Sequence, residues 1–219
     1  YESAIKAGVL DTRLVEQLKD ELIKIKPMKA VFDKNYIVNL NPNNIKSEAT
    51  KYEHAQELIN DIQTFKEENN CSRLVMVWCG STEVYSKASE VHQTVESLED
   101  GLKSDNPAIP PSMIYAYAAL KSGVPFANGS PNLACDVPAM VDLAIQTNTP
   151  IAGKDYKSGQ TFMKTILAPG LRGRLLGLDG WFSTNILGNR DGEVLNNFDN
   201  FRSKEVSKSG VLDEILEPE

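Results

Sequence analysis

The fold is decided by Arg73-Leu-Val-Met-Val-Trp-Cys79, a continuous apolar run that passes directly into Gly80-Ser-Thr-Glu83. A short apolar run without alternation is typical of a strand buried on both faces, as in a parallel sheet that helices cover. In open α/β sheets, ligands bind beyond the carboxyl ends of the strands. We therefore expect Gly80, Ser81 and Thr82 to contact a phosphate or a ribose.

Strands and helices alternate on both sides of this run. The spacing of apolar residues and turn formers predicts helices over about 11–26, 52–68, 112–122, 137–147 and 158–176, and strands over 124–127 and 149–152. Extended segments are expected over 30–38 and 181–186, and Pro169 should kink or break the last helix. This alternation favours an α/β architecture.

Composition excludes several classes of protein. The 219 residues, of which 41% are hydrophobic, suffice for one large domain or two small ones with real cores. A net charge of -7 argues against a general nucleic-acid binder, because such proteins need a basic face to displace counterions from phosphates. The three cysteines lack CxxC spacing, and no apolar run approaches the roughly 20 residues that span a bilayer. We expect a soluble, cytoplasmic protein with neither a nucleic acid nor a membrane as partner.

Fingerprints for nucleotides and metals do not occur. The sequence contains neither G-x-G-x-x-G nor G-x-x-x-x-G-K-[ST], so it does not by itself establish a nucleotide site. His54 and His92 have no carboxylate or cysteine at metal-ligand spacing. Both lie among polar residues of helical character, so we expect them at the surface and expect no metal site.

Basic side chains are concentrated between residues 151 and 174, in an otherwise acidic chain. Five bases stand against the single acid Asp155, and the local net charge of about +4 indicates an anion site. Ser158-Gly-Gln-Thr161, at the start of the predicted helix, adds hydroxyls and free amides where phosphates readily bind. A solvated lysine face, with Ser158 as a simple helix cap, fits the composition equally well. The five bases are Lys154, Lys157, Lys164, Arg172 and Arg174.

Three further segments are each compatible with two interpretations. Asn128-Gly-Ser-Pro131 and Gly188-Asn-Arg-Asp-Gly192 follow predicted extended segments and carry side chains that suit hydroxyl groups, but both are equally compatible with tight turns. Lys204 and Lys208 would lie one turn apart on one helical face, which is also typical of a solvated surface.

Five motifs, in chain order, resemble the myo-inositol-1-phosphate synthase family. They are Val77-Trp-Cys-Gly-Ser-Thr-Glu-Val-Tyr85, Val124-Pro-Phe-Ala-Asn-Gly-Ser-Pro131, Gly153-Lys-Asp-Tyr-Lys-Ser-Gly-Gln-Thr161, Asn185-Ile-Leu-Gly-Asn-Arg-Asp-Gly192 and Arg202-Ser-Lys-Glu-Val-Ser-Lys-Ser209. The resemblance covers nearly the whole chain, with most weight on residues 74–209.

The resemblance also implies a domain organisation. Residues 1–131 are expected to form part of a Rossmann-like NAD-binding domain, and residues 132–219 an incomplete α+β domain for catalysis and tetramer formation. The chain begins and ends within helical patterns, so we expect an internal piece of a longer protein. The family's glycine-rich NAD loop would precede this piece, and a further sheet segment would follow it.

The activity implied is the conversion of D-glucose 6-phosphate into 1D-myo-inositol 3-phosphate. NAD oxidises C5, the ketone acidifies the C6 protons, the C6 enolate attacks the C1 aldehyde, and NADH reduces the C5 ketone. Cationic donors in a dry pocket stabilise the enolate and alkoxides that develop in this sequence. The whole protein is expected to be a homotetramer, with glucose 6-phosphate as substrate and NAD as cofactor.

Roles for individual residues follow from the same resemblance. Phe162 stands where the family has a second lysine, so Lys164 is expected to serve with the other two catalytic lysines. Lys154 stands where the family has an acid, and Cys79-Gly-Ser where it has Thr-Ala-Asn. The catalytic lysines are Lys157, Lys208 and Lys164; the substrate contacts are Asn128, Ser130, Ser158, Gly159, Gln160, Thr161, Asn189 and Asp191; the NAD contacts are Gly80, Ser81, Thr82 and Asp155.

Two other functions are compatible with the sequence. The chain could be a non-catalytic module that supplies an oligomer interface and a phosphate-binding loop. It could also be part of an NAD-linked dehydrogenase. Net accumulation of NADH would mark the dehydrogenase, whereas the synthase regenerates NAD in every turnover.

Overall fold

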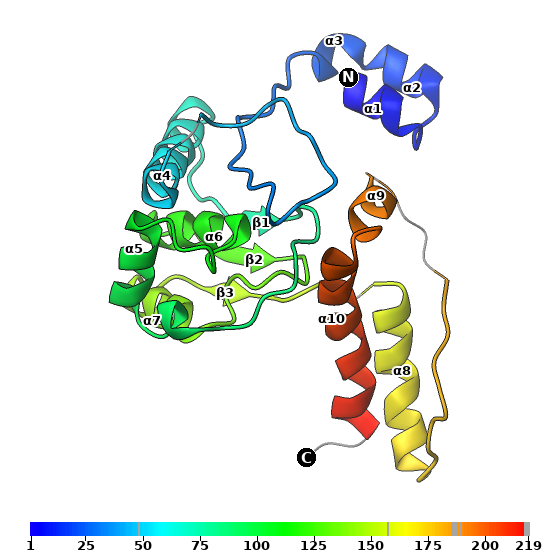
Figure 1. Cartoon of the computed structure of the whole chain (residues 1–219). Helices are drawn as coiled ribbons and strands as arrows, with labels where there is room; N and C mark the ends of the chain where they lie inside the picture. The colour runs from blue at the N-terminus through cyan, green and yellow to red at the C-terminus, as the bar shows by residue number, and fades with distance from the viewer. Residues whose placement is uncertain (48, 157, 185–187, 189, 217–219) are drawn as a thin grey trace.

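A three-stranded parallel sheet organises the chain, as the computed structural model shows (Figure 1). The strands are β1 (Met76–Trp78), β2 (Phe126–Asn128) and β3 (Ile151–Ala152), in the order β1-β2-β3. The structure describes every residue of the chain except 48, 157, 185–187, 189 and 217–219. Each of the three predicted strands is present, though shorter than expected, and the α/β class is confirmed.

Four helices pack with the sheet into one body: α4 (Lys51–Glu68), α5 (Val95–Lys103), α6 (Pro111–Lys121) and α7 (Pro138–Gln146). Helix α6 contacts α4, α7 and β2, and nearly all of its side chains are buried. A helix that is apolar on every side belongs in the centre of a core. The predictions for α4, α6 and α7 are confirmed to within two residues. Helix α5 is absent from the prediction, although Val95, Leu98 and Leu102 recur at helical spacing.

Two long helices lie side by side and project away from the sheet (Figure 1). They are α8 (Gln160–Gly173) and α10 (Phe198–Leu216), and the short helix α9 (Asp191–Leu195) precedes α10. The helix predicted over 158–176 is therefore confirmed. Pro169 lies inside α8 without ending it, so the break that Pro169 could have caused is not observed.

The single helix predicted over 11–26 is wrong. Two short helices, α2 (Thr12–Gln17) and α3 (Lys19–Leu22), follow α1 (Glu2–Ala7). Asp11 caps α2, because its side chain accepts a hydrogen bond from the backbone N–H of Arg13 at 2.8 Å. Most of the apolar stripe lies exposed, as at Leu18 and Ile25, so packing does not hold a long helix together here.

The extended segments expected over 30–38 and 181–186 also differ from the structure. In the first, only Ala30 pairs with another segment, through an isolated bridge to Ile45. In the second, residues 181–184 form no strand, and residues 185–186 lie outside the described part of the chain. Among the described residues, neither segment has a neighbouring strand to complete a ladder of hydrogen bonds.

The first strand is less buried than its sequence predicts. Val75 is 63% exposed and Val77 48% exposed, so burial on both faces is wrong for this strand. The reason is its place in the sheet, since β1 pairs only with β2 among the described residues and lies at an edge. The apolar run identifies the strand correctly but not its neighbours.

His92 is fully buried, which contradicts the expected surface position. Its Nδ1 accepts a hydrogen bond from the backbone N–H of Ser89, at 2.9 Å, and its Nε2 lies 3.1 Å from the carbonyl oxygen of Ala108. Both ring nitrogens therefore have partners, as a buried imidazole requires. His54 is only partly buried.

The division of the chain between residues 131 and 132 stays a prediction. The sheet itself continues past this point, because β3 and α7 both lie in the second of the two expected domains. None of the helices in the described part of the chain combines the length and the apolar character that a bilayer crossing requires.

Burial in the core predicts how much a truncated side chain lowers the free energy of unfolding. Leu98 on α5 is 0% exposed within the main apolar cluster, so Leu98→Ala should lower the free energy of unfolding by about 2–5 kcal/mol. Leu18, which is 47% exposed, is the matched control, and Leu18→Ala should change it by only about 0.5 kcal/mol. Urea titrations followed by circular dichroism measure both values. Equal losses would contradict the assignment of Leu98 to the core.

Candidate functional site

A cavity of about 350 Å³, called the main cavity below, lies where the segments after the three strands meet α10. Its walls come from residues 79–82 after β1, residues 129–131 after β2, and residues 155, 156 and 158 after β3. The predicted site residues that line it are Gly80, Ser81, Thr82, Ser130, Asp155, Ser158, Asp191 and Lys208. Residues predicted for different roles are therefore neighbours in space, although they are spread over 129 positions of sequence, from 80 to 208.

The loop after β2 is shaped by its own asparagine. The Oδ1 of Asn128 accepts hydrogen bonds from the backbone N–H and the hydroxyl of Ser130, at 3.0 and 2.9 Å, while its Nδ2 donates to the carbonyl oxygen of Asn132. Its side chain is 4% exposed and lies outside the main cavity. Asn128 thus holds Ser130 in place, and the predicted turn and the predicted site coincide in this loop.

Asn132 joins this loop to the loop after β1. Its Oδ1 accepts a hydrogen bond from the backbone N–H of Glu83 at 2.8 Å, and its Nδ2 donates to the carbonyl oxygen of Ser81 at 3.1 Å. The residue is 2% exposed. Sequence reasoning missed Asn132, because nothing near it along the chain indicates a partner some 50 residues away.

The side chain of Tyr156 lies so close to Gly129 that a side chain at position 129 would collide with it. A Cβ atom at this position would lie 2.2 Å from the ring of Tyr156, far inside van der Waals contact. The Tyr156 hydroxyl in turn lies 3.0 Å from the Sγ of Cys79. A larger residue at position 129 would therefore displace the Tyr156 ring, whereas glycine lets it lie against the loop after β2 in the wall of this cavity.

Two carboxylates and two lysines line the cavity, namely Asp155, Asp191, Lys204 and Lys208. The Nζ of Lys204 forms an ion pair with the Oδ2 of Asp191 at 3.1 Å. The hydroxyl of Ser207 donates to the Oδ2 of Asp155 at 2.9 Å. Lys204 was not predicted as a site residue, although its spacing from Lys208 placed it on the same helical face.

A second cavity, of about 650 Å³, lies between α8 and α10 and shares Lys204 and Lys208 with the first. Lys164 lines it and is 4% exposed, and its Nζ donates to the carbonyl oxygen of Lys208 at 2.7 Å. Burial, and secondly the charge of Lys208, lower the pKa of Lys164. The predicted residue Gln160 also lines this cavity.

The remaining predicted residues of this segment have different positions. Gly159 precedes α8 with φ 58°, a left-handed conformation that suits glycine, and lines neither cavity. Thr161 is 1% exposed, and its hydroxyl has no hydrogen-bond partner within the described part of the chain. Lys157 and Asn189 lie outside the described residues.

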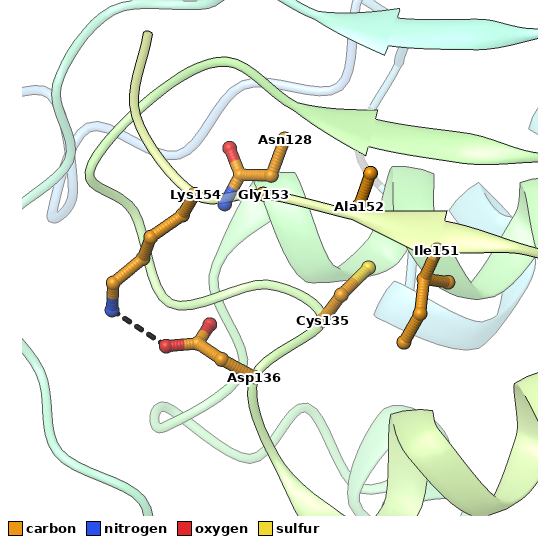
Figure 2. A pocket seen from close by; sticks show the side chains of 7 residues that line it. All are labelled: Asn128, Cys135, Asp136, Ile151, Ala152, Gly153 and Lys154. Atoms are coloured by element: carbon orange, nitrogen blue, oxygen red, sulfur yellow. Dashed lines mark hydrogen bonds and ion pairs between the residues drawn. The ribbon is translucent and has the colours of Figure 1, made fainter. Parts of the chain in front are cut away.

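Lys154 does not contribute to the main cavity. Its Nζ lies 2.5 Å from the Oδ2 of Asp136, at a smaller hollow of about 180 Å³ at the end of β3 (Figure 2). Arg172 and Arg174 line neither of the two larger cavities. None of the described bases of this segment lines the main cavity, and the described cations of that cavity, Lys204 and Lys208, come from α10.

Glu83 lies fully buried behind the cavity wall. Its carboxylate accepts hydrogen bonds from the backbone N–H and the hydroxyl of Ser112, at 2.9 and 2.6 Å, where α6 begins. Burial raises the pKa of Glu83 to about 7, and the bonds from Ser112 only partly oppose this. The charge of Asp33 acts in the same direction as burial.

Known proteins resemble this chain over its whole length. A family model for myo-inositol-1-phosphate synthase matches residues 1–206. The inositol-3-phosphate synthase 1 of Bacteroides thetaiotaomicron is 53% identical, over 100% of this chain and 51% of that protein. That of Saccharomyces cerevisiae is 37% identical, over 99% of this chain and 43% of that protein. The crystal structure of the Caenorhabditis elegans inositol-3-phosphate synthase has a TM-score of 0.91 at 30% identity and covers 100% of this chain and 45% of that one. The chain thus spans about half the length of these relatives.

The buried Glu83 predicts an unusual pH dependence of stability. Its pKa is raised on folding, so the stability that it contributes is present below about pH 4.5 and is lost as the pH rises through about 7. The amide of Glu83→Gln cannot ionise, so the variant should gain on the order of 2–3 kcal/mol relative to the native protein over this window. Urea titrations at a series of pH values measure the difference.

The control for this prediction is Glu99. Burial acts upward on its pKa, but hydrogen bonds from Tyr117 and Lys121 outweigh it, and the pKa of Glu99 is lowered on folding. Glu99→Gln should therefore show no relative gain between about pH 4.5 and 7. A flat difference for Glu83→Gln across the same window would contradict the raised pKa.

Proposed function

The chain belongs to the myo-inositol-1-phosphate synthase family, and from this premise we propose that the whole protein converts D-glucose 6-phosphate into 1D-myo-inositol 3-phosphate with NAD as cofactor. The observation that carries the proposal is the convergence of three strand-end segments and the lysines of α10 on one cavity. Such a crevice at the carboxyl ends of parallel strands is where α/β proteins bind nucleotides and phosphorylated substrates.

The donor set of the main cavity fits part of a dinucleotide. The hydroxyls of Ser81, Ser130 and Ser158 and the carboxylate of Asp155 gather there, and a carboxylate is well suited to accept hydrogen bonds from ribose hydroxyls. We assign NAD contacts to Gly80, Ser81, Thr82 and Asp155 on this basis. Bound NAD supplies the oxidation and later the reduction at C5 of the sugar.

The lysines are proposed to handle the charge that develops on the sugar. Lys208 and Lys204 stand on the wall shared by both cavities, where their ammonium groups can reach an enolate, an alkoxide or a phosphate. Within the described part of the chain, Lys208 forms no ion pair, whereas Lys204 is held by Asp191. We therefore propose Lys208 as the cation that meets the developing oxyanion, together with Lys157.

The second cavity suits the remainder of the substrate. We propose that the phosphate of glucose 6-phosphate lies there, near Gln160 and Lys164. Thr161, whose hydroxyl has no hydrogen-bond partner within the described part of the chain, is proposed as a further contact. A lysine with a lowered pKa releases and takes up protons more readily near neutral pH. Lys164 is accordingly proposed as a proton-transfer group, and Asn128, Ser130, Ser158, Gly159, Asn189 and Asp191 as the other substrate contacts.

We also propose a cytoplasmic homotetramer for the whole protein. Large apolar side chains stay exposed on and after α8, with Phe162 52%, Leu175 95% and Phe182 92% exposed. Exposed apolar surface of this kind supports association with other chains or with further parts of the protein. The three cysteines of the chain are all free, which is compatible with a reducing compartment.

The reaction itself is the first test. The full-length protein, incubated with glucose 6-phosphate and NAD, should form inositol 3-phosphate with no net accumulation of NADH, because C5 is oxidised and then reduced in each turnover. Phosphorus NMR identifies the product, and absorbance at the NADH band follows the cofactor. Steady accumulation of NADH would instead indicate a simple dehydrogenase, and no reaction at all would contradict the proposal.

Two lysine variants test the assignment of roles. Lys157→Ala and Lys208→Ala in the full-length protein should each lower kcat by about a hundredfold or more, the usual cost of removing one donor to a developing oxyanion. Both should still bind NAD, which fluorescence titration measures. Lys103→Ala is the control, since this lysine, which pairs with Asp100 and lies over the ring of Tyr52, lines neither cavity and its loss should leave kcat unchanged. Normal turnover by either active-site variant would refute its role.

A further inference from the structure

We propose that Asn200 and Ser203 are positioning residues, which dock the first turns of α10 onto the backbone of Thr82 and Glu83 and thereby set where Lys204 and Lys208 stand. The inference deepens the proposed function and rests on it. It concerns two side chains that line neither of the larger cavities. Their effect on the reaction would therefore be indirect, and it would act mainly through the helix that carries both lysines.

Asn200 connects three segments of the chain through one amide group. It is 0% exposed, and its Nδ2 donates to the carbonyl oxygens of Thr82 and Tyr36, both at 2.8 Å. Buried polar groups of the backbone require partners, so each of these bonds is costly to lose. Thr82 lies in the wall of the main cavity. The start of α10 is thus bonded directly to the loop after β1.

Ser203 adds a second bond on the same side of the helix. Its hydroxyl donates to the carbonyl oxygen of Glu83 at 2.8 Å, and the residue is 5% exposed. In the opposite direction, the backbone N–H of Tyr85 donates to the carbonyl oxygen of Asp199 at 3.0 Å. Residues 199, 200 and 203 share one helical face, so this face of α10 is fixed against residues 82–85.

The backbone that receives α10 is itself anchored to the core. The N–H of Glu83 donates to Asn132, and its carboxylate accepts both hydrogen bonds from Ser112, which is 0% exposed at the start of α6. Helix α10 is therefore bonded, through the backbone of residue 83, to the core of the protein and not to a loop without other contacts. Docking at this point can define the geometry of the cavity.

Because α10 is one continuous helix, the position of its first turns determines the positions of both lysines. Lys204 and Lys208 follow Asn200 at intervals of four residues, so all three lie along one stripe of α10. At a rise of about 1.5 Å per residue, Lys208 stands about 12 Å beyond Asn200, and a tilt of about 5° at the docking point would move it by about 1 Å. Displacements of that size can lower the rate of a reaction by about a hundredfold.

The decisive experiment uses Ser203→Ala in the full-length protein. We expect kcat for glucose 6-phosphate to fall about ten- to a hundredfold, while KM for NAD changes by less than about twofold, because the strand-end loops stay in place. Ser122→Ala is the matched control. It also removes a serine hydroxyl that donates to a backbone carbonyl at 2.8 Å, but at the end of α6, away from α10, so kcat should stay within about twofold.

A second pair of variants removes the stronger contact. Asn200→Ala should lower kcat more than Ser203→Ala does, because two bonds are lost instead of one. Its control is Asn44→Ala, since the Nδ2 of Asn44 also donates to two backbone carbonyls, those of Pro27 and Met28. Thermal melts monitor folding of all four variants. If Asn200→Ala does not fold, Ser203→Ala decides the matter.

Each outcome bears on the inference. Equal kcat for Ser203→Ala and Ser122→Ala would overturn it, as would a loss for both variants that merely follows their melting temperatures. A native protein that does not convert glucose 6-phosphate would refute the proposed function instead. Amide hydrogen exchange then tests the docking alone. Faster exchange at Val84, Tyr85 and along 204–208 in Ser203→Ala than in Ser122→Ala supports the positioning role, and equal rates refute it.

Discussion

The hydrogen bonds of the Asn132 side chain are the constraint on which the rest of the site depends. Two strand-end loops, one after β1 and one after β2, would each leave backbone groups buried without partners if they stood alone. The side-chain amide of Asn132, which belongs to the loop after β2, serves the backbone of the loop after β1, as donor to the Ser81 carbonyl oxygen and as acceptor from the Glu83 N–H. Because one planar group makes both bonds, the two loops hold a fixed separation. The main cavity is the space that this separation leaves open.

The buried carboxylate of Glu83, behind the wall of the main cavity, is also stabilised by hydrogen bonds. Removing the charge of Glu83 from water is unfavourable, which is why its pKa rises. The start of α6 offers compensation, since free N–H groups and the helix dipole favour an acceptor there. Among the described residues, the carboxylate is held by Ser112 alone and pairs with no cation. Its hydrogen bonds serve to fix residue 83, and α10 is bonded to the backbone of that same residue.

The elements that the sequence predicts well are those whose signal is local. The apolar run before Cys79, the spacing in α4 and the turn residues after β2 all depend on neighbours within a few positions, and all three appear in the structure. The exposure of Val75 and the burial of His92 depend on how the elements pack in space, so local patterns gave the wrong expectation. Asn132, Asn200 and Ser203 were missed for the same reason, since a single sequence carries no sign of contacts 49 to 164 residues away.

The charge pattern of the sequence does not predict which bases line the main cavity. The excess of bases between residues 151 and 174 predicted an anion site, yet Lys154 pairs with Asp136, and the arginines line neither larger cavity. Among the described residues, the cations that line the main cavity are Lys204 and Lys208, which α10 supplies from a later part of the chain. Composition therefore did not indicate these side chains, and an anionic ligand stays a prediction. Those side chains were indicated by their spacing of one helical turn and by the family motif, and their distance from the strand-end loops is governed by how α10 docks.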